Sequence, residues 1–347
     1  MKATHLPRRA AGNKLREDRA PDATKKVRLS HRWGIVLAGG DGVRLRSLTR
    51  LICGDDRPKQ FCPLLGECTL LEQACQRAER SIHPQHILFA LTKAHQDYYL
   101  PDLGHRLSHR IVQPCNRGTA PPILYSLLHI AQIDPDAIIA VLPCDHYYSD
   151  ESAFTRALGS AFDMAARRPQ SIVLLGAQPN APEVEYGWIE VAATVHGELL
   201  QVQGFHEKPP FSVAERLFQN GALWNTFVMV GRLDAFLRMA SATVPGLLDV
   251  FQSATRRSRN QCETRIPDSL YDWVSPIDFS RSILSPAARH LVALPLQNME
   301  WHDLGDPDRV LTTLLTRNAA LPDWAQHWQA SRKAAGASSA RSASAVA

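Results

Sequence analysis

Three glycines stand close together in the stretch LAGGDGVRLR, residues 37–46. Gly39, Gly40 and Gly42 can adopt positive φ angles, which lets successive backbone N–H groups point at one anion. Arg44 adds a planar fork of donors that suits a phosphate group. We therefore interpret the stretch as a phosphate-binding loop. The alternative is a tight turn followed by a solvent-facing arginine.

The spacing of the glycines excludes two common phosphate loops. A P-loop requires a lysine and then Ser or Thr after its glycines, and no lysine stands at that spacing. The dinucleotide fingerprint GxGxxG would need a third glycine at position 45, where the chain has Leu45. The pattern that remains is GGxGxR directly behind an apolar run.

A second basic element follows the glycine loop. The segment RPKQF, residues 57–61, supplies Lys59. An isolated lysine is usually a surface residue. Beside an anion-binding loop, however, Lys59 would neutralise a second phosphate group.

Alternating strand and helix patterns must position these residues. Strands are predicted at residues 33–38, 86–92, 137–146 and 171–177, and helices at 69–82, 120–132 and 152–168. The alternation favours a largely parallel sheet covered by helices on both faces. Ligands of such sheets bind beyond the carboxyl ends of the strands. The glycine loop and Asp145 both follow strand ends, so one cleft would hold both.

The second half of the chain mixes strand-like runs with turns. We expect a helical subregion within 233–278 and a helix over 306–320. Residues 31–329 are treated as one catalytic domain. Residues 1–30 form a basic leader and residues 330–347 a low-complexity tail, and both are expected to be disordered. The leader has no apolar core, so it is not a secretory signal.

The composition limits the class of partner. The chain has 347 residues, 45% of them hydrophobic and 21% charged, as in an ordinary globular protein. No apolar run approaches the roughly 20 residues of a membrane-spanning helix. The net charge of +5 lies partly in the leader, and a nucleic-acid-binding arm is the less favoured interpretation of that leader. We therefore expect small-molecule substrates, with neither nucleic acid nor membrane as a partner.

The cysteines indicate the compartment. There are seven, an odd number, and none are spaced as CxxC. This usage is typical of a reduced cytoplasmic protein without a zinc site or a disulfide framework.

Eight segments in a fixed order resemble the sugar-1-phosphate nucleotidyltransferases. Within that family the segments are most similar to those of mannose-1-phosphate guanylyltransferases. The resemblance covers residues 33–320 and rests on LAGGDGVRLRSLTR…RPKQF, QPCNRGTAPPI, VLPCDH, EYGWIE, FHEKP, LWNTFVMV, SPIDFS and WHDLGD. It implies an α/β, Rossmann-like nucleotidyltransferase fold with a mostly parallel central sheet, helices on both faces and an inserted β-region at the sugar site.

The resemblance also implies a reaction. The phosphate oxygen of mannose 1-phosphate would attack the α-phosphorus of GTP, giving GDP-mannose and pyrophosphate with the help of Mg²⁺. Positioning and charge neutralisation carry most of the catalysis in reactions of this kind. Two alternatives stay open: the same chemistry with another hexose or heptose 1-phosphate and another nucleoside triphosphate, or an inactive sensor that only binds sugar nucleotides.

Roles for individual residues follow from the same resemblance. Arg44 would hold the departing pyrophosphate and Lys59 would balance charge at the α-phosphate. Asp145 and Asp303 would hold Mg²⁺, which usually takes only one or two protein carboxylates. The nucleotide-binding residues would be Leu37, Ala38, Gly39, Gly40, Gly42, Asn116, Arg117, Gly118 and Thr119. The sugar-phosphate-binding residues would be Tyr186, Gly187, Glu207, Lys208 and Asn225.

The two histidines beside the aspartates receive no catalytic role. His146 and His302 are interpreted as supporting residues, because nothing in this reaction requires a histidine base.

The chain departs from the family pattern at four places. Val43 replaces a common threonine, and residues 51–57 form a longer flap with two unexplained acids, Asp55 and Asp56. Gly118 stands where many guanylyltransferases have asparagine, and Thr226-Phe227 where Ser-Gly is common. Base and sugar preference are therefore left open. We expect no assembly through a left-handed β-helix, whereas a homodimer formed by another surface stays open.

Overall fold

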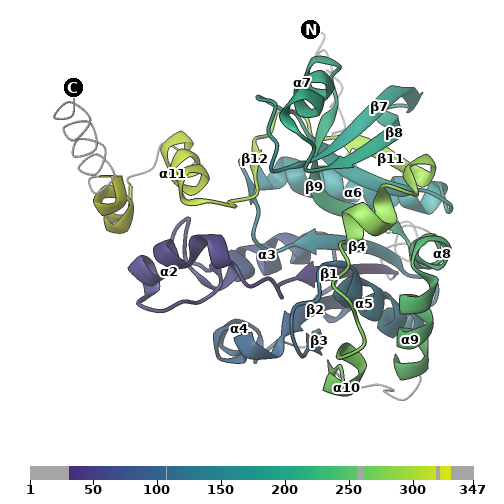
Figure 1. Cartoon of the computed structure of the whole chain (residues 1–347), viewed down its shortest axis with the longest axis horizontal. Helices are drawn as coiled ribbons and strands as arrows, with labels where there is room; N and C mark the ends of the chain where they lie inside the picture. Colours follow the sequence, from purple (N-terminus) through teal and green to yellow (C-terminus); the bar gives the residue numbers. More distant parts are fainter. Residues whose placement is uncertain (1–30, 107, 256–261, 318–320, 330–347) are drawn as a thin grey trace, which may run out of the picture.

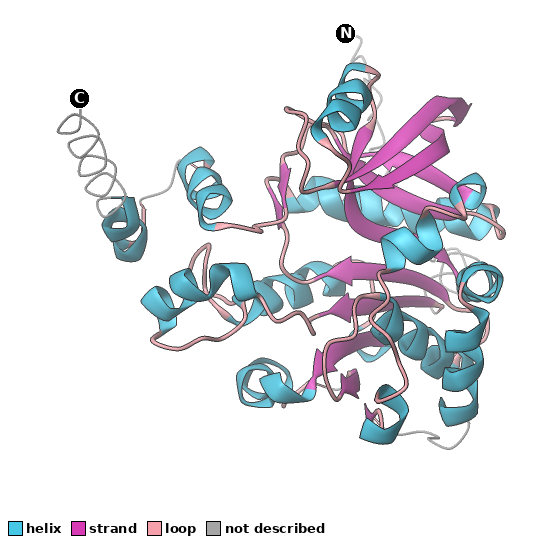
Figure 2. Cartoon of the chain, in the orientation of Figure 1, coloured by secondary structure: helices cyan, strands magenta, loops and turns pink. Residues whose placement is uncertain are grey.

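The computed structural model describes residues 31–106, 108–255, 262–317 and 321–329 (Figure 1). The predictions of a disordered leader and tail fall on residues 1–30 and 330–347, which lie outside the described residues. A large sheet runs through the middle of the molecule, with helices on either side of it (Figure 2).

Ten strands form this sheet, in the order β10-β3-β2-β1-β4-β9-β6-β11-β8-β7, and β9 also pairs with β7. Their bounds are β1 (Arg32–Leu37), β2 (Ile87–Thr92), β3 (His109–Gln113), β4 (Ile138–Pro143), β6 (Ile172–Ala177), β7 (Gly187–His196), β8 (Leu199–Glu207), β9 (Leu223–Arg232), β10 (Glu263–Arg265) and β11 (Leu291–Pro295). A separate two-stranded sheet joins β5 (Tyr147–Tyr148) to β12 (Trp301–His302).

The prediction of an α/β fold is confirmed, but the sheet is mixed. Neighbouring strands are parallel from β10 to β4 and again between β6 and β11. The pairs β4–β9, β9–β6, β11–β8 and β8–β7 are antiparallel. The alternation of strands and helices predicted β1, β2, β4 and β6 and the helices near residues 69–82, 120–132 and 152–168, but it missed β3 and the helices at 46–53 and 96–103. It could not predict that β9 inserts between β4 and β6 from far along the chain.

The central strands are buried on both faces, as expected of parallel strands covered by helices. Successive residues of a strand point to opposite faces. Accordingly Val36 belongs to one hydrophobic cluster and its neighbour Ile35 to the other. The same division separates Leu142 from Val141 on the adjacent strand.

Helices cover both faces of the sheet, as predicted. Residues of α3, α4 and α6 pack in the first cluster, whereas residues of α5, α8 and α9 pack in the second. The helix bounds are α2 (Arg46–Cys53), α3 (Leu70–Glu79), α4 (Gln96–Leu103), α5 (Ala120–Ile133), α6 (Glu151–Arg167), α7 (Phe211–Gln219), α8 (Leu233–Thr243), α9 (Pro245–Thr255), α10 (Asp268–Tyr271) and α11 (Pro307–Thr316). Residues 323–329 are also helical.

Local signals explain where several of these helices begin. Thr69 and Glu72 form a reciprocal capping box at the start of α3. Prolines occupy the first turn of α5, where the missing N–H costs no helical hydrogen bond. The carboxylate of Asp306 accepts hydrogen bonds from two backbone N–H groups and so begins α11.

A third hydrophobic cluster joins two helices that are far apart in the sequence. Leu48 of α2 and Val310 of α11 both belong to it, and the two helices lie on the same side of the molecule (Figure 1).

The predicted flap at 51–57 is partly helical, because α2 continues to Cys53 and ends at Gly54, whose φ is 80°. Asp55 forms an ion pair with Arg57 at 2.8 Å, and Asp56 one with Arg50 at 2.6 Å.

Among the helices within the described ranges, none is both long enough and apolar enough to cross a membrane.

Candidate active site

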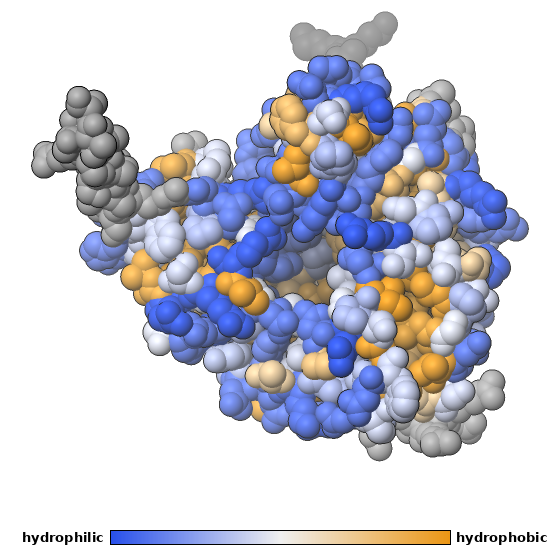
Figure 3. Space-filling view, in the orientation of Figure 1, coloured by the Kyte–Doolittle hydropathy of each residue, from blue (hydrophilic) through white to orange (hydrophobic). Residues whose placement is uncertain are grey.

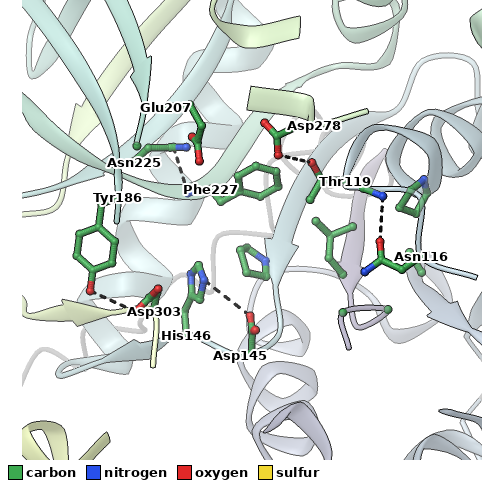
Figure 4. Close-up of a pocket in the computed structure, with 18 of the residues that line it drawn as sticks. Asn116, Thr119, Asp145, His146, Tyr186, Glu207, Asn225, Phe227, Asp278 and Asp303 are labelled. Carbon is green, nitrogen blue, oxygen red and sulfur yellow. Dashed lines mark hydrogen bonds and ion pairs between the residues drawn. The ribbon is translucent and has the colours of Figure 1, made fainter. Parts of the chain in front are cut away.

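A cavity of about 380 Å³ opens where β1 and β4 end. Its place agrees with the rule that ligands of α/β sheets bind beyond the carboxyl ends of the strands. The space-filling view shows a hollow at the centre of this face (Figure 3), and Figure 4 shows the lining side chains. Of the predicted site residues, those that line it are Leu37, Gly39, Gly40, Asn116, Gly118, Thr119, Asp145, Tyr186, Gly187, Glu207, Asn225 and Asp303.

The glycine loop is held against the segment that carries Lys59. Gly42 has a φ of 57°, and a Cβ atom there would lie 2.9 Å from the backbone nitrogen of Lys59. The Gln60 side-chain amide donates to the carbonyl oxygens of Ala38 (3.1 Å) and Gly40 (2.7 Å). Gln60 is buried, and its role was missed from the sequence. The only signal was its position beside Lys59.

The Lys59 ammonium group connects the cavity to residues 303–304. It lies 3.1 Å from Asp145 Oδ2. It also donates to the carbonyl oxygens of Asp303 (2.5 Å) and Leu304 (3.1 Å). A single cation thus holds together three segments that are separated by up to 245 residues.

The Asp303 carboxylate is surrounded by donors. Its Oδ1 accepts hydrogen bonds from the Gly305 N–H (2.9 Å), the Arg309 guanidinium (3.1 Å) and the Tyr186 hydroxyl (3.2 Å). Burial would raise the pKa of Asp303, but the charges of Lys59 and Arg309 and the hydrogen bond from Gly305 outweigh it. The pKa therefore lies below its ordinary value, and the carboxylate is ionised at neutral pH.

Arg309, on the first turn of α11, is a site residue that the sequence analysis missed. Besides Asp303 it contacts Glu183 at 2.8 Å and Asp306 at 3.2 Å. Its guanidinium also stacks over the Tyr186 ring, 4.5 Å from the centroid. The sequence signal for Arg309 was local. Asp306, the last residue of the motif WHDLGD, begins α11, and Arg309 lies on the first turn of that helix.

The opposite end of the cavity holds Glu207, where burial and the nearby charge of Asp278 raise the pKa of its carboxyl. Gly187 packs closely beside it, because a Cβ atom at this position would lie 2.8 Å from Glu207 Oε2 and would displace the Glu207 carboxylate. Asn225 and Tyr186 complete this side (Figure 4).

A third group of polar residues lies between the end of β3 and α5. The Asn116 amide donates to Asp41 at 3.0 Å, and its oxygen accepts from the Gly118 N–H at 2.9 Å. Thr119 donates to Asp278 Oδ2 at 3.2 Å. Asp278 lines the cavity as well and was not among the predicted residues, although it stands in the quoted motif SPIDFS.

The departure at Gly118 has a steric reason. Residue 118 has a φ of 84°, and a Cβ atom would lie 2.4 Å from the Ile277 carbonyl oxygen. The same carbonyl accepts from the Ala120 N–H at 3.0 Å, and the Ile277 N–H donates to the Arg117 oxygen at 3.0 Å. Segment 275–279 therefore packs so closely that only glycine fits at this position.

Six predicted residues lie outside the cavity lining: Ala38, Gly42, Arg44, Lys59, Arg117 and Lys208. Lys59 contacts the cavity-lining Asp145, and the Gln60 amide joins the carbonyl oxygen of Ala38 to that of the cavity-lining Gly40. Arg44 is exposed and contacts the cavity-lining Glu185 at 3.2 Å, and Lys208 lies 3.9 Å from the same carboxylate. Val43, which replaces a common threonine, is 61% exposed.

Both histidines are in supporting positions. His146 is partly buried and lines the cavity, accepts a hydrogen bond from the Trp301 indole at 3.3 Å, and lies 3.7 Å from Asp145. Its burial lowers its pKa. His302 shares a hydrogen bond of 2.6 Å with Thr313 on α11, and burial lowers the pKa of His302 too.

Comparison with known proteins gives one family. The family model described as nucleotidyl transferase matches residues 33–317. The xanthan biosynthesis protein XanB of Xanthomonas campestris pv. campestris is 30% identical over 276 residues, covering 78% of this chain and 57% of that protein. A mannose-1-phosphate guanylyltransferase of Sinorhizobium fredii is 26% identical over 284 residues, covering 79% of this chain and 53% of that protein. The chain thus spans about half the length of the curated relatives it matches.

A solved structure resembles the chain over much of its length. It comes from Thermus thermophilus and is described as a mannose-1-phosphate geranyltransferase. The two superpose with a TM-score of 0.68 at 26% sequence identity, covering 79% of this chain and 76% of the other.

Proposed function

Because the chain belongs to the nucleotidyl transferase family, we propose that it transfers GMP from GTP to mannose 1-phosphate, forming GDP-mannose and releasing pyrophosphate. One observation carries this proposal. The Lys59 ammonium joins Asp145 and the 303–304 turn beside the glycine loop, within reach of a cavity that extends to Glu207. Such a site suits two phosphorylated substrates that must meet at one phosphorus atom.

The reaction requires little covalent chemistry from the protein. A phosphate oxygen of the sugar phosphate forms a bond to the α-phosphorus of GTP, while the bond from that phosphorus to the bridging oxygen breaks and pyrophosphate leaves. Lys59 balances charge at the α-phosphate, and the N–H groups of Gly39 and Gly40 face the phosphates. Arg44 binds the pyrophosphate, and Lys208 binds the sugar phosphate. Both cations lie near Glu185, whose carboxylate the substrate phosphates would replace as their partner.

We further propose that Asp145 and Asp303 hold Mg²⁺. Both carboxylates line the cavity, and the donors on Asp303 contact Oδ1 rather than Oδ2. No group of three or more His, Cys, Asp or Glu side chains is placed to hold a metal ion in the part of the chain that the structure describes. Two carboxylates completed by phosphate oxygens and water suit Mg²⁺, which rarely takes an all-protein shell. When bound, the ion would neutralise negative charge on the phosphates.

The remaining polar residues divide between the two substrates. Asn116, Arg117, Gly118 and Thr119 would contact the nucleotide together with the backbone of residues 37–39. Glu207 would accept hydrogen bonds from sugar hydroxyls, with Asn225, Tyr186 and Gly187 completing the sugar pocket. We place the reaction in the cytoplasm, because the seven cysteines are free thiols.

A second candidate function keeps the chemistry and changes the substrates. The glycine at 118 and the phenylalanine at 227 favour it, since both line the cavity and both depart from the guanylyltransferase pattern. Another hexose or heptose 1-phosphate with another nucleoside triphosphate would then be the preferred pair.

The test is pyrophosphate release from the purified chain with Mg²⁺, four nucleoside triphosphates and a panel of sugar 1-phosphates. We expect the highest kcat/KM with GTP and mannose 1-phosphate. A higher value for another pair would establish the second candidate instead. Absence of turnover with every pair would overturn both, and nucleotide binding measured by calorimetry in that case would identify a sensor.

A further inference from the structure

A bulge in β9 turns one aromatic side chain toward the cavity. Leu174 of β6 pairs with Met229, and Gly176 pairs with Asn225, so β9 uses five residues where β6 uses three. Thr226 fills the irregularity by donating from Oγ1 to the Leu175 carbonyl oxygen at 2.7 Å. Bulges of this kind change the direction of a side chain and are common beside active sites. The side chain whose direction changes is Phe227.

The backbone at Phe227 adopts a conformation that bulky residues rarely take. Its φ is 60°, in the left-handed region where a Cβ atom is crowded and glycine is favoured. The strand holds it there, because the Phe227 N–H donates to Asn225 Oδ1 at 3.1 Å and the Val228 N–H to Thr226 Oγ1 at 3.3 Å. The surrounding structure therefore supports a strained residue inside the cavity.

The Phe227 ring lies in the middle of the cavity and is an apolar surface among polar groups. Asn225 and Glu207 lie on one side of it, and Asp278 and Thr119 on the other (Figure 4). The ring is half-buried, and its aromatic contact is with Phe279, whose centroid is 6.5 Å away. The ring thus occupies space between the two ends of the cavity, which is only about 380 Å³ in volume.

We propose that Phe227 determines which sugar 1-phosphate the site accepts. The Phe227 ring packs against a C–H face of the bound hexose, while Glu207 accepts hydrogen bonds from the hydroxyl groups of the hexose. The ring also fills the volume that an acetamido substituent would need. The preferred substrates are then unsubstituted hexose 1-phosphates, and N-acetylhexosamine 1-phosphates are excluded. This inference rests on the proposed function, since it concerns the sugar side of the same cavity.

Binding measurements test the proposal independently of turnover. Calorimetry with Mg²⁺ gives the dissociation constants of mannose 1-phosphate and N-acetylglucosamine 1-phosphate for the wild-type chain and for Phe227→Gly. Glycine adopts a φ of 60° without strain, so the variant should fold. We expect the wild type to prefer the unsubstituted sugar, and the variant to reduce that preference at least tenfold.

Two further variants separate the ring from the backbone. Phe227→Leu keeps an apolar side chain at the same position and should retain most of the wild-type preference. Asn298→Gly relieves another positive φ, of 52°, at a residue that does not line this cavity, and should leave the preference unchanged. Where turnover is measurable, Phe227→Gly should change the KM for the sugar phosphate and leave the KM for GTP within about twofold.

Three results would overturn the proposal: an unchanged preference in Phe227→Gly, an equal change in Asn298→Gly, or no binding of either sugar phosphate to any variant. Each differs from failure of the proposed function, which would show as bound mannose 1-phosphate and GTP without release of pyrophosphate.

Discussion

The carboxyl groups at the two ends of the cavity have pKa values that are shifted in opposite directions. Beside Lys59 and Arg309, at what we propose is the phosphate end, Asp303 is partly buried and its pKa falls below the ordinary value. At what we propose is the sugar end, burial and the charge of Asp278 raise the pKa of Glu207. Both are acids inside one cavity, so the difference comes from their neighbours rather than from their chemistry.

The difference teaches how each end is built. The phosphate end is organised by paired charges, in which Lys59 and Arg309 each contact several acceptors. The sugar end is organised by backbone geometry, with the positive φ angle of Phe227 and the close approach of Gly187 to Glu207. Loss of charge should therefore damage the first end most, and added volume or relieved strain the second.

Removing the Lys59 charge should have the largest effect. We expect Lys59→Met to lower kcat by about 10²–10³-fold, the range found for removal of one preorganised charge-stabilising group. The control is Lys93→Met, because Lys93 is exposed and lies 3.8 Å from Asp268. Steady-state kinetics of pyrophosphate release measure both. A near-normal kcat in Lys59→Met would show that charge does not organise the phosphate end.

Arg309→Met should come next. Arg309 does not line the cavity, so we expect it to act by orienting Asp303. Loss of such a supporting contact should raise the Mg²⁺ concentration needed for half-maximal activity by about 10–100-fold. Arg238→Met is the matched control, because Arg238 is an exposed arginine paired with Asp234 on the same helix. Unchanged Mg²⁺ dependence would leave Arg309 with a purely structural role.

Gly118→Ala tests backbone geometry in the third group of polar residues, between β3 and α5. The new Cβ atom would lie 2.4 Å from the Ile277 carbonyl oxygen at a φ of 84°, so we expect a loss of about 1–3 kcal/mol in the free energy of unfolding. Gly221→Ala, at a φ of 73° in open space, carries the backbone strain without the clash. Denaturant unfolding should show a smaller loss for Gly221→Ala. Equal losses would mean that segment 275–279 moves away readily.

The smallest effect is a pH dependence of stability from Glu207. Because the folded pKa is raised, the wild-type carboxyl contributes most at a pH below its unfolded value of about 4.3, and the contribution is lost as pH rises through the folded pKa. The free energy of unfolding of the wild type, relative to that of Glu207→Gln, should therefore decrease as the pH rises from 4 to neutrality. Thermal unfolding across this range measures it. Exposed Glu215 supplies the control variant Glu215→Gln, for which the difference should stay flat.

The sequence alone predicted β1, β2, β4, β6, α3, α5 and α6, for local reasons. The signals were the apolar runs of β1, β2 and β4, the helical spacing of the apolar residues in α3 and the prolines in the first turn of α5, and each lies within a few neighbouring positions. The glycine loop and Asp145 were expected to share a cleft because both follow strand ends, and residues 39 and 40 and Asp145 do line one cavity. The roles assigned to them remain predictions.

Tertiary structure decided which side chains meet. Lys59 and the 303–304 turn are more than 240 residues apart, and no local pattern records a contact of that separation. The place of β9 between β4 and β6 likewise made the sheet mixed, and its bulge directed Phe227 into the cavity. Propensity and periodicity are properties of neighbouring residues. The charges around Asp303 and the bulge that places Phe227 in the cavity both depend on contacts with segments far away in the sequence.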